Sequence, residues 1–153
     1  MTDLEYMQEA LALAKQAVAA DEVPVGAVVV SRGEIVGRGY NQREKGKDAT
    51  LHAETIAIRQ ACAKLGGWRI PDSTLYVTLE PCPMCAGAMV NARINRLVYG
   101  AADPKAGAAG SVLNIVDHPG LNHRLTVESG LLQEEAAALL KEFFARKRRK
   151  AEK

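Results

Sequence analysis

Hydrophobic residues repeat at the three- and four-residue spacing of an α-helix near the start of the chain, which predicts a helix over residues 2–19. Thr2 and Glu5 have the spacing of a capping box at its first turn. Three later stretches are also predicted to be helical: residues 52–64, which a pair of glycines ends, residues 82–91, which follow a proline, and residues 131–149.

Short runs of β-branched and alternating residues predict the strands. Residues 25–31 and 34–40 flank a tight turn at Arg32-Gly33, so we predict a β-hairpin there. Three further strands are predicted at residues 74–80, 96–100 and 125–128. Three glycines interrupt the hairpin and indicate bulges or the close approach of a neighbouring element: Gly26, Gly37 and Gly39.

The alternation of helices and strands predicts an α/β domain with helices on both faces of a mixed sheet. The segment 101–122 before the last strand is rich in glycine and alanine, and we expect one helical turn in it at residues 112–116. Its length permits a parallel crossover between the last two strands. No linker or repeat divides the sequence, so we expect one domain over residues 1–153.

The composition is typical of a soluble globular protein, because 48% of the residues are hydrophobic and 25% are charged. No apolar run reaches the length of a membrane span, and the acidic N-terminus lacks the apolar stretch of a signal peptide. Two of the three cysteines form a C-x-x-C pair, which indicates reduced, metal-binding thiols and not a disulfide framework. We therefore expect a cytoplasmic protein with no membrane association.

The formal charge of +2 is unevenly distributed along the chain. The C-terminal segment 145–153 holds six basic residues and one acidic residue, a local charge of +5 that leaves −3 for the rest. Such a segment is by default a solvated, frayed helix end. The alternative is a patch that attracts a polyanion such as RNA.

One imidazole and two thiolates are candidate zinc ligands: His52, Cys82 and Cys85. Three protein ligands leave one tetrahedral position open, and a catalytic zinc holds its water there. Glu54 lies two residues after the histidine and is placed to move protons for that water. The two cysteines are three residues apart at the start of a predicted helix, so both thiols face one side. The pattern predicts a hydrolytic zinc enzyme.

This interpretation has one difficulty and one competitor. In a regular helix, residues two apart point in directions about 200° apart, so His52 has to reach the metal from the first turn while Glu54 projects toward the open position. The competitor is a closed structural site, whose fourth ligand would be His118, His123 or Cys62. Structural sites usually pair two short ligand couples, and here a lone histidine accompanies the C-x-x-C.

H-x-E together with P-C-x-x-C is the known signature of zinc-dependent nucleobase deaminases. Longer segments resemble the bacterial tRNA adenosine deaminases, the TadA family, and the likeness covers essentially residues 4–150 in order. These segments are E-V-P-V-G-A at residues 22–27, H-A-E at 52–54, L-Y-V-T-L-E-P-C-P-M-C-A-G-A at 75–88, G-A-A-G-S at 107–111, H-P-G-L-N-H-R at 118–124, and the pair Phe143-Phe144 before the basic segment.

The resemblance implies the three-layer α/β/α cytidine-deaminase-like fold, with a central mixed sheet of five strands. It implies hydrolytic conversion of adenosine to inosine at the wobble position of a tRNA anticodon, with tRNA-Arg as the expected substrate. One Zn²⁺ per subunit would be held by His52, Cys82 and Cys85, and Glu54 would shuttle protons. The implied partners are the anticodon stem-loop and a second copy of the chain, as a homodimer, and no other protein partner is implied.

The resemblance also implies seven RNA-contacting residues. Asn41 contacts the flipped nucleotide, the main chain of Ala53 helps read the base edge, Asp103, Lys105 and Asn122 hold the anticodon loop, Phe144 forms a wall, and Arg146 contacts a phosphate.

Simpler roles are open for three of these positions: Asn41 as a strand end, Asp103-Pro104 as a turn, and Phe143-Phe144 as part of the core. Two other functions are also open. One is deamination of a free base or nucleoside such as guanine or cytosine at the same zinc centre. The other is a non-catalytic, zinc-stabilised RNA-binding protein.

Overall fold

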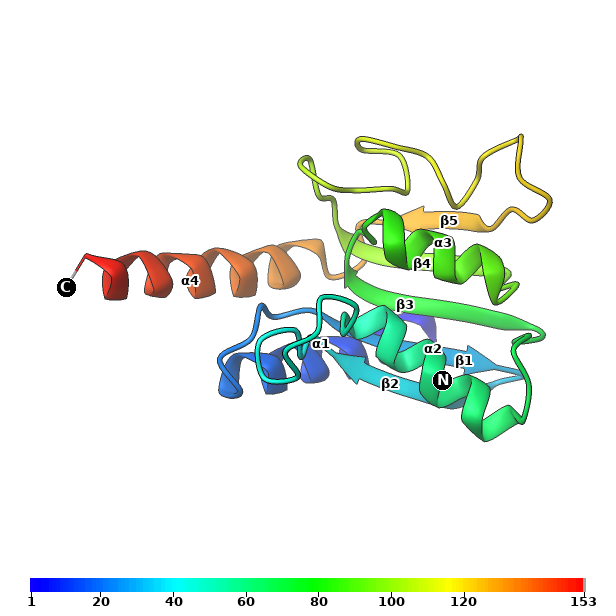
Figure 1. Ribbon diagram of the computed structural model, residues 1–153, viewed down its shortest axis with the longest axis horizontal. Helices are drawn as coiled ribbons and strands as arrows, with labels where there is room; N and C mark the ends of the chain where they lie inside the picture. The colour runs from blue at the N-terminus through cyan, green and yellow to red at the C-terminus, as the bar shows by residue number, and fades with distance from the viewer. Residues whose placement is uncertain (153) are drawn as a thin grey trace.

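A mixed five-stranded sheet with helices on both faces forms the centre of the protein in the computed structural model, which describes residues 1–152 (Figure 1). The elements are α1 (Asp3–Ala19), β1 (Gly26–Ser31), β2 (Glu34–Tyr40), α2 (Ala53–Leu65), β3 (Ser73–Leu79), α3 (Pro83–Asn91), β4 (Arg96–Ala101), β5 (Thr126–Ser129) and α4 (Gln133–Ala151). The strand order is β2-β1-β3-β4-β5. Strand β1 is antiparallel to both β2 and β3, whereas β3, β4 and β5 are parallel. The predicted fold class and the parallel crossover are therefore confirmed.

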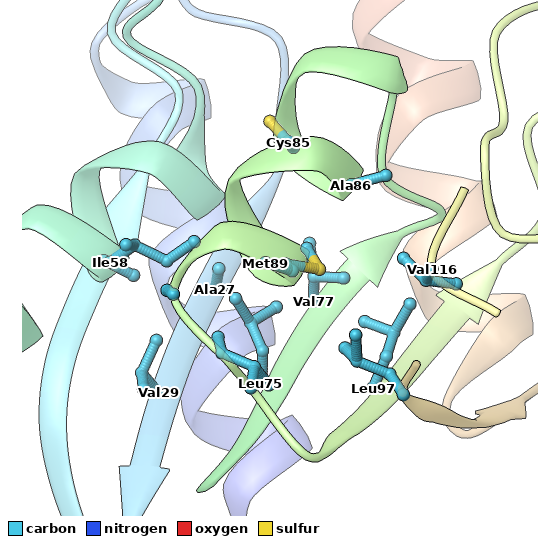
Figure 2. Close-up of a cluster of buried hydrophobic side chains, with 14 of the residues drawn as sticks. Ala27, Val29, Ile58, Leu75, Val77, Cys85, Ala86, Met89, Leu97 and Val116 are labelled. Atoms are coloured by element: carbon cyan, nitrogen blue, oxygen red, sulfur yellow. The ribbon is translucent and has the colours of Figure 1, made fainter. Parts of the chain in front are cut away.

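Alternating side chains of the sheet build two separate cores. Val28 and Val30 of β1 pack with α1, while Ala27 and Val29 point to the opposite face, where α2 and α3 lie. Figure 2 shows this second core, in which Met89 of α3 packs over residues of β3 and β4. Helix α1 thus forms one outer layer, and α2 with α3 forms the other, while α4 extends away from the sheet (Figure 1).

The hairpin glycines are sites of close helix approach. A Cβ built on Gly26 would lie 2.0 Å from the Ala10 carbonyl oxygen of α1, and one on Gly37 would lie 2.1 Å from the Ala57 carbonyl oxygen of α2. Both distances are far below any real contact, so larger residues here would push the helices off the sheet. The sequence prediction of close approach is confirmed.

The expected helical turn at residues 112–116 is wrong. The segment is irregular and forms an isolated bridge between Ala109 and Asn114. Its main-chain N–H groups bond to the start of the loop, since Val112 donates to Gly107 and Ile115 donates to Ala108, both at 2.9 Å. Val112 is 52% exposed whereas Val116 is buried, so these two residues do not share the buried face that a helical turn would give them. Within residues 1–152, no helix is both long and apolar enough to span a membrane.

An ion pair joins the start of α1 to the start of β4. Two guanidinium nitrogens of Arg96 donate to the two carboxylate oxygens of Asp3, at 2.9 and 2.6 Å, and the Tyr76 hydroxyl also donates to Asp3. These hydrogen bonds from Arg96 and Tyr76 lower the pKa of Asp3 to about 2. A carboxylate with a lowered pKa stabilises the fold above its ordinary pKa of 3.8, and this contribution disappears as the pH falls through about 2.

We therefore expect Asp3→Asn to lower the free energy of unfolding by about 1 kcal/mol at pH 7 and to have a much smaller effect near pH 2, where about half of the Asp3 carboxylates are protonated. The value is set low because the Asp3 side chain is 42% exposed and solvent screens the pair. Urea denaturation from pH 7 to pH 2 measures the difference. Asp72→Asn is the matched control, because its partner Arg32 is 3.8 Å away on an exposed turn. Equal destabilisation by Asp3→Asn at both ends of the pH range would contradict the ion-pair explanation.

Candidate metal and nucleotide site

The candidate site lies at the edge of the sheet where β2, β3 and β4 end. Strands β3 and β4 are parallel neighbours with Leu79 opposite Ala101, so the segments that follow them start side by side. A pocket of about 180 Å³ that opens to solvent lies at this edge. Ligands of open α/β sheets commonly bind at the carboxyl ends of the strands.

The three predicted metal ligands meet beside this pocket. The Nδ1 atom of His52 lies 3.6 Å from the Cys82 Sγ and 3.5 Å from the Cys85 Sγ. Zinc bonds of ordinary length to nitrogen and sulfur at a tetrahedral angle place such atoms about 3.5 Å apart. All three ligand atoms lie within 4.8 Å of one another. The residues therefore fit a tetrahedral zinc ion with one position left for a non-protein ligand.

Local structure explains how His52 and Glu54 both reach the site. His52 is the N-cap of α2, with φ −86° and ψ 159°, so it lies outside the helix, and the 200° separation of helical neighbours does not apply. Both residues line the pocket. Cys82 is the N-cap of α3 and Cys85 lies in its first turn, so two helix N-termini face the cluster. The positive ends of the two helix dipoles favour thiolates and a metal-bound hydroxide.

The thiols have opposite pKa shifts because they share a hydrogen bond. The Cys85 thiol, with a further contribution from His52, lowers the pKa of Cys82 to about 4. The same hydrogen bond and burial raise the pKa of Cys85. The hydrogen bond with Cys82 raises the pKa of His52.

Glu54 is the buried carboxyl group of the site. It is only 4% exposed, and its burial raises its pKa to about 7. A group that takes up and releases a proton near neutral pH is suited to general acid–base chemistry.

The closed-site alternative finds no fourth protein ligand among residues 1–152. The only His, Cys, Asp and Glu residues of this part of the chain that cluster with metal-site geometry are the three already named. His123 bonds to the Ile94 carbonyl oxygen through Nε2 at 2.6 Å, and His118 accepts from the Gly120 N–H. Cys62 lies on α2, 3.6 Å from the Trp68 carbonyl oxygen.

Three of the predicted substrate residues line the pocket: Asn41, Ala53 and Asp103. Asn41 directly follows β2 and is buried, and the Arg43 N–H approaches its side-chain oxygen at 3.4 Å. Asp103 accepts from the N–H groups of Lys105 and Ala106, at 3.0 and 3.2 Å, and so forms a turn. The strand-end and turn interpretations are therefore correct, and both side chains remain at the pocket.

The other four lie outside the pocket lining: Lys105, Asn122, Phe144 and Arg146. Lys105 and Asn122 are exposed. Phe143 is buried, whereas Phe144 is 45% exposed, so only the first of the pair belongs to the core. The basic segment is helical to Ala151, and the Lys147 ammonium group donates to the Asp21 carboxylate at 2.6 Å. Lys153, the last residue of the predicted basic segment, lies outside the described residues.

Three charged residues were not predicted from the sequence: Arg43 and Glu80 line the pocket, and Glu22 directly precedes the lining residue Val23. Glu22, 1% exposed, accepts from the main-chain N–H groups of Glu44 and Lys45 at 3.0 and 2.7 Å. Glu80, 2% exposed, accepts from the loop after β4. The available signal was a glutamate one or two residues before a proline, in Glu22-Val23-Pro24 ahead of β1 and in Glu80-Pro81 after β3.

Comparison with known proteins finds similarity to deaminases by sequence and by structure. The model of the MafB19-like deaminase family matches residues 1–148. A tRNA-specific adenosine deaminase of Bacillus subtilis (strain 168) is 48% identical over 145 residues, which cover 95% of this chain and 90% of that protein. A solved structure from a study of A-to-I editing by tRNA:A34 deaminases at the wobble position of transfer RNA is 47% identical, with a TM-score of 0.85 over 89% of this chain and 99% of that one. A guanine deaminase from Nitrosomonas europaea is 30% identical, with a TM-score of 0.82 over 94% of this chain and 85% of that one.

Proposed function

The chain belongs to the MafB19-like deaminase family and, within it, to the bacterial tRNA-specific adenosine deaminases, and we propose that it hydrolyses adenosine to inosine at the wobble position of a tRNA anticodon. The observation that carries this proposal is the 48% identity to a tRNA-specific adenosine deaminase over 95% of this chain and 90% of that protein. The guanine deaminase has a similar fold but is only 30% identical.

We propose that His52, Cys82 and Cys85 hold one zinc ion per subunit, which their N···S distances of 3.5 and 3.6 Å support. When bound, zinc lowers the pKa of a coordinated water to about 7.

Glu54 supplies the proton transfers of the proposed reaction. Hydrolysis adds water at C6 of the adenine ring, breaks the C6–N bond and releases ammonia. Glu54 takes a proton from the attacking water and delivers it to the departing amino group, so the carboxylate is regenerated at the end of the cycle. Its 4% exposure keeps bulk water from competing for that proton.

The RNA contacts stay predictions of the family resemblance. Asn41, Ala53 and Asp103 are proposed to hold the flipped nucleotide, which their place in the pocket supports. The four residues outside the pocket are proposed to contact the surrounding anticodon loop: Lys105, Asn122, Phe144 and Arg146. A basic segment that stays helical to Ala151 supports a phosphate-binding role for Arg146.

Four further features of the whole protein also stay predictions: the homodimer, the single domain over residues 1–153, the preference for tRNA-Arg, and the cytoplasmic location that a tRNA substrate favours.

Guanine deamination is the second candidate function, and the Nitrosomonas europaea structure favours it. The two candidate functions are distinguished by the kcat/KM values for three substrates, measured on one zinc-loaded preparation. The substrates are an anticodon stem-loop with a wobble adenosine, guanine and cytosine. We expect the stem-loop to be preferred by at least about a hundredfold, because only RNA uses the contacts outside the pocket. A higher kcat/KM for guanine would favour the second candidate. RNA binding without turnover of any of the three would indicate a non-catalytic protein.

A further inference from the structure

A buried carboxylate outside the proposed zinc ligands, Glu80, holds the loop that follows β4. Glu80 comes directly after β3, is 2% exposed, and lines the pocket. Its two oxygens accept four hydrogen bonds, all from residues 103–111. Oε1 accepts from the Asp103 N–H at 3.0 Å and from the Ser111 hydroxyl, and Oε2 accepts from the N–H groups of Ala109 and Ser111 at 3.0 and 3.1 Å.

The loop also packs directly on this carboxylate. A Cβ built on Gly107 would lie 2.4 to 2.5 Å from the Glu80 carboxylate atoms, so only glycine fits there without a shift. The next residue, Ala108, donates its N–H to the Pro81 carbonyl oxygen at 2.8 Å. Pro81 precedes the proposed zinc ligand Cys82. The segment that carries the ligand and the loop after β4 are thus joined at Glu80-Pro81.

The loop that Glu80 holds forms one side of the pocket. Asp103 and Ala106 line the pocket, as do His52 and Cys82. The Asp103 carboxylate sets the shape of its own turn by accepting from the N–H groups of Lys105 and Ala106. The hydrogen bond from the Asp103 N–H to Glu80 is therefore the link between this turn and the end of β3.

We infer that Glu80 is a positioning residue that places the Asp103 turn relative to the proposed zinc site and thereby governs how tightly the pocket binds the target nucleotide. This inference rests on the proposed function, because the nucleotide is the substrate whose binding it concerns. The hydrogen bonds of the Glu80 carboxylate described above all come from the loop and none from Glu54.

A glutamine cannot replace this carboxylate without losing the link to Asp103. All four partners can donate, and a carboxylate accepts at both oxygens, whereas a carboxamide accepts at one and donates at the other. With its oxygen toward Ala109 and Ser111, the amide group can donate to the Ser111 hydroxyl but faces the Asp103 N–H with a second donor. The reverse orientation would leave the N–H groups of Ala109 and Ser111 without an acceptor. The favoured arrangement of Glu80→Gln thus gives up the Asp103 bond alone.

We expect Glu80→Gln to raise the KM for the anticodon stem-loop about tenfold and to change kcat less than about threefold, with zinc content unchanged. Amide hydrogen exchange should quicken at Asp103 and stay slow at Ala109 and Ser111. Gly107→Ala tests the same contact from the loop side with the carboxylate intact, and it should raise KM similarly. Asp3→Asn is the stability control, since it weakens the fold on the far side of the sheet and should leave KM unchanged.

Three outcomes would overturn the inference. They are an unchanged KM in both variants, a loss of zinc in proportion to the loss of activity, and a fall in kcat at constant KM. If the wild-type protein turns over guanine but not the stem-loop, the proposed function fails instead. In that case the exchange measurement at Asp103 still tests whether Glu80 places the loop.

Discussion

Glu54→Gln is expected to lower kcat for inosine formation by about 10²- to 10⁴-fold while zinc content and fold are retained. The side chain is 4% exposed, and its burial raises its pKa to about 7, so the carboxyl group can both accept and return a proton near neutral pH. Glutamine has nearly the same shape but cannot exchange a proton. Single-turnover kinetics on a wobble-adenosine stem-loop, with zinc measured on the same sample, check this expectation.

Glu9→Gln is the control for that experiment. Glu9 lies on α1, 3.9 Å from Arg38 in an exposed ion pair, and its replacement should leave kcat unchanged. If Glu54→Gln kept near-normal turnover, Glu54 would not be the proton shuttle, and the catalytic interpretation of the zinc cluster would be wrong.

Cys82→Ser is expected to abolish zinc retention and activity together. A thiolate is a strong zinc ligand, and the surroundings of Cys82 lower its pKa to about 4, whereas a serine hydroxyl stays protonated at neutral pH. Because zinc binding adds its free energy to the folded state, the variant should also unfold at a lower temperature than the zinc-loaded wild type. Metal analysis and thermal unfolding of the purified proteins measure both effects.

Cys62→Ser is the matched control for Cys82→Ser, because Cys62 and Cys82 are both half-buried thiols. Cys62 is not part of the metal cluster, so its serine variant should keep zinc, activity and thermal stability close to those of the wild type. Equal zinc loss in the two variants would contradict the assignment of Cys82 as a ligand.

The cluster of His52, Cys82 and Cys85 could be predicted from the sequence, because residue type and spacing alone identify them as candidate metal ligands. How Glu54 reaches the site could not, because helix geometry puts positions 52 and 54 on opposite sides. The conflict disappears only because His52 adopts extended backbone angles as the N-cap. A cap and a first helical residue differ by backbone angles that the residue types do not specify.

The loops were predicted less well than the helices and strands. The apolar residues at 112–116 suggested a helical turn, but their N–H groups bond to residues 107 and 108 instead. Glu22 and Glu80 were missed because glutamate is usually solvent-exposed. Each is buried only because two or more N–H groups from a distant loop converge on it, and sequence spacing does not reveal such long-range pairing.

The central claim is that this site deaminates the wobble adenosine of a tRNA anticodon, and mapping the product tests it most directly. Zinc-loaded protein is incubated with an anticodon stem-loop, and nuclease fragments are examined by mass spectrometry for replacement of an amino group by oxygen. We predict inosine at the wobble position, none at the other adenosines of the stem-loop, and none with Glu54→Gln. Unmodified RNA from a zinc-bound protein that deaminates guanine would contradict the claim.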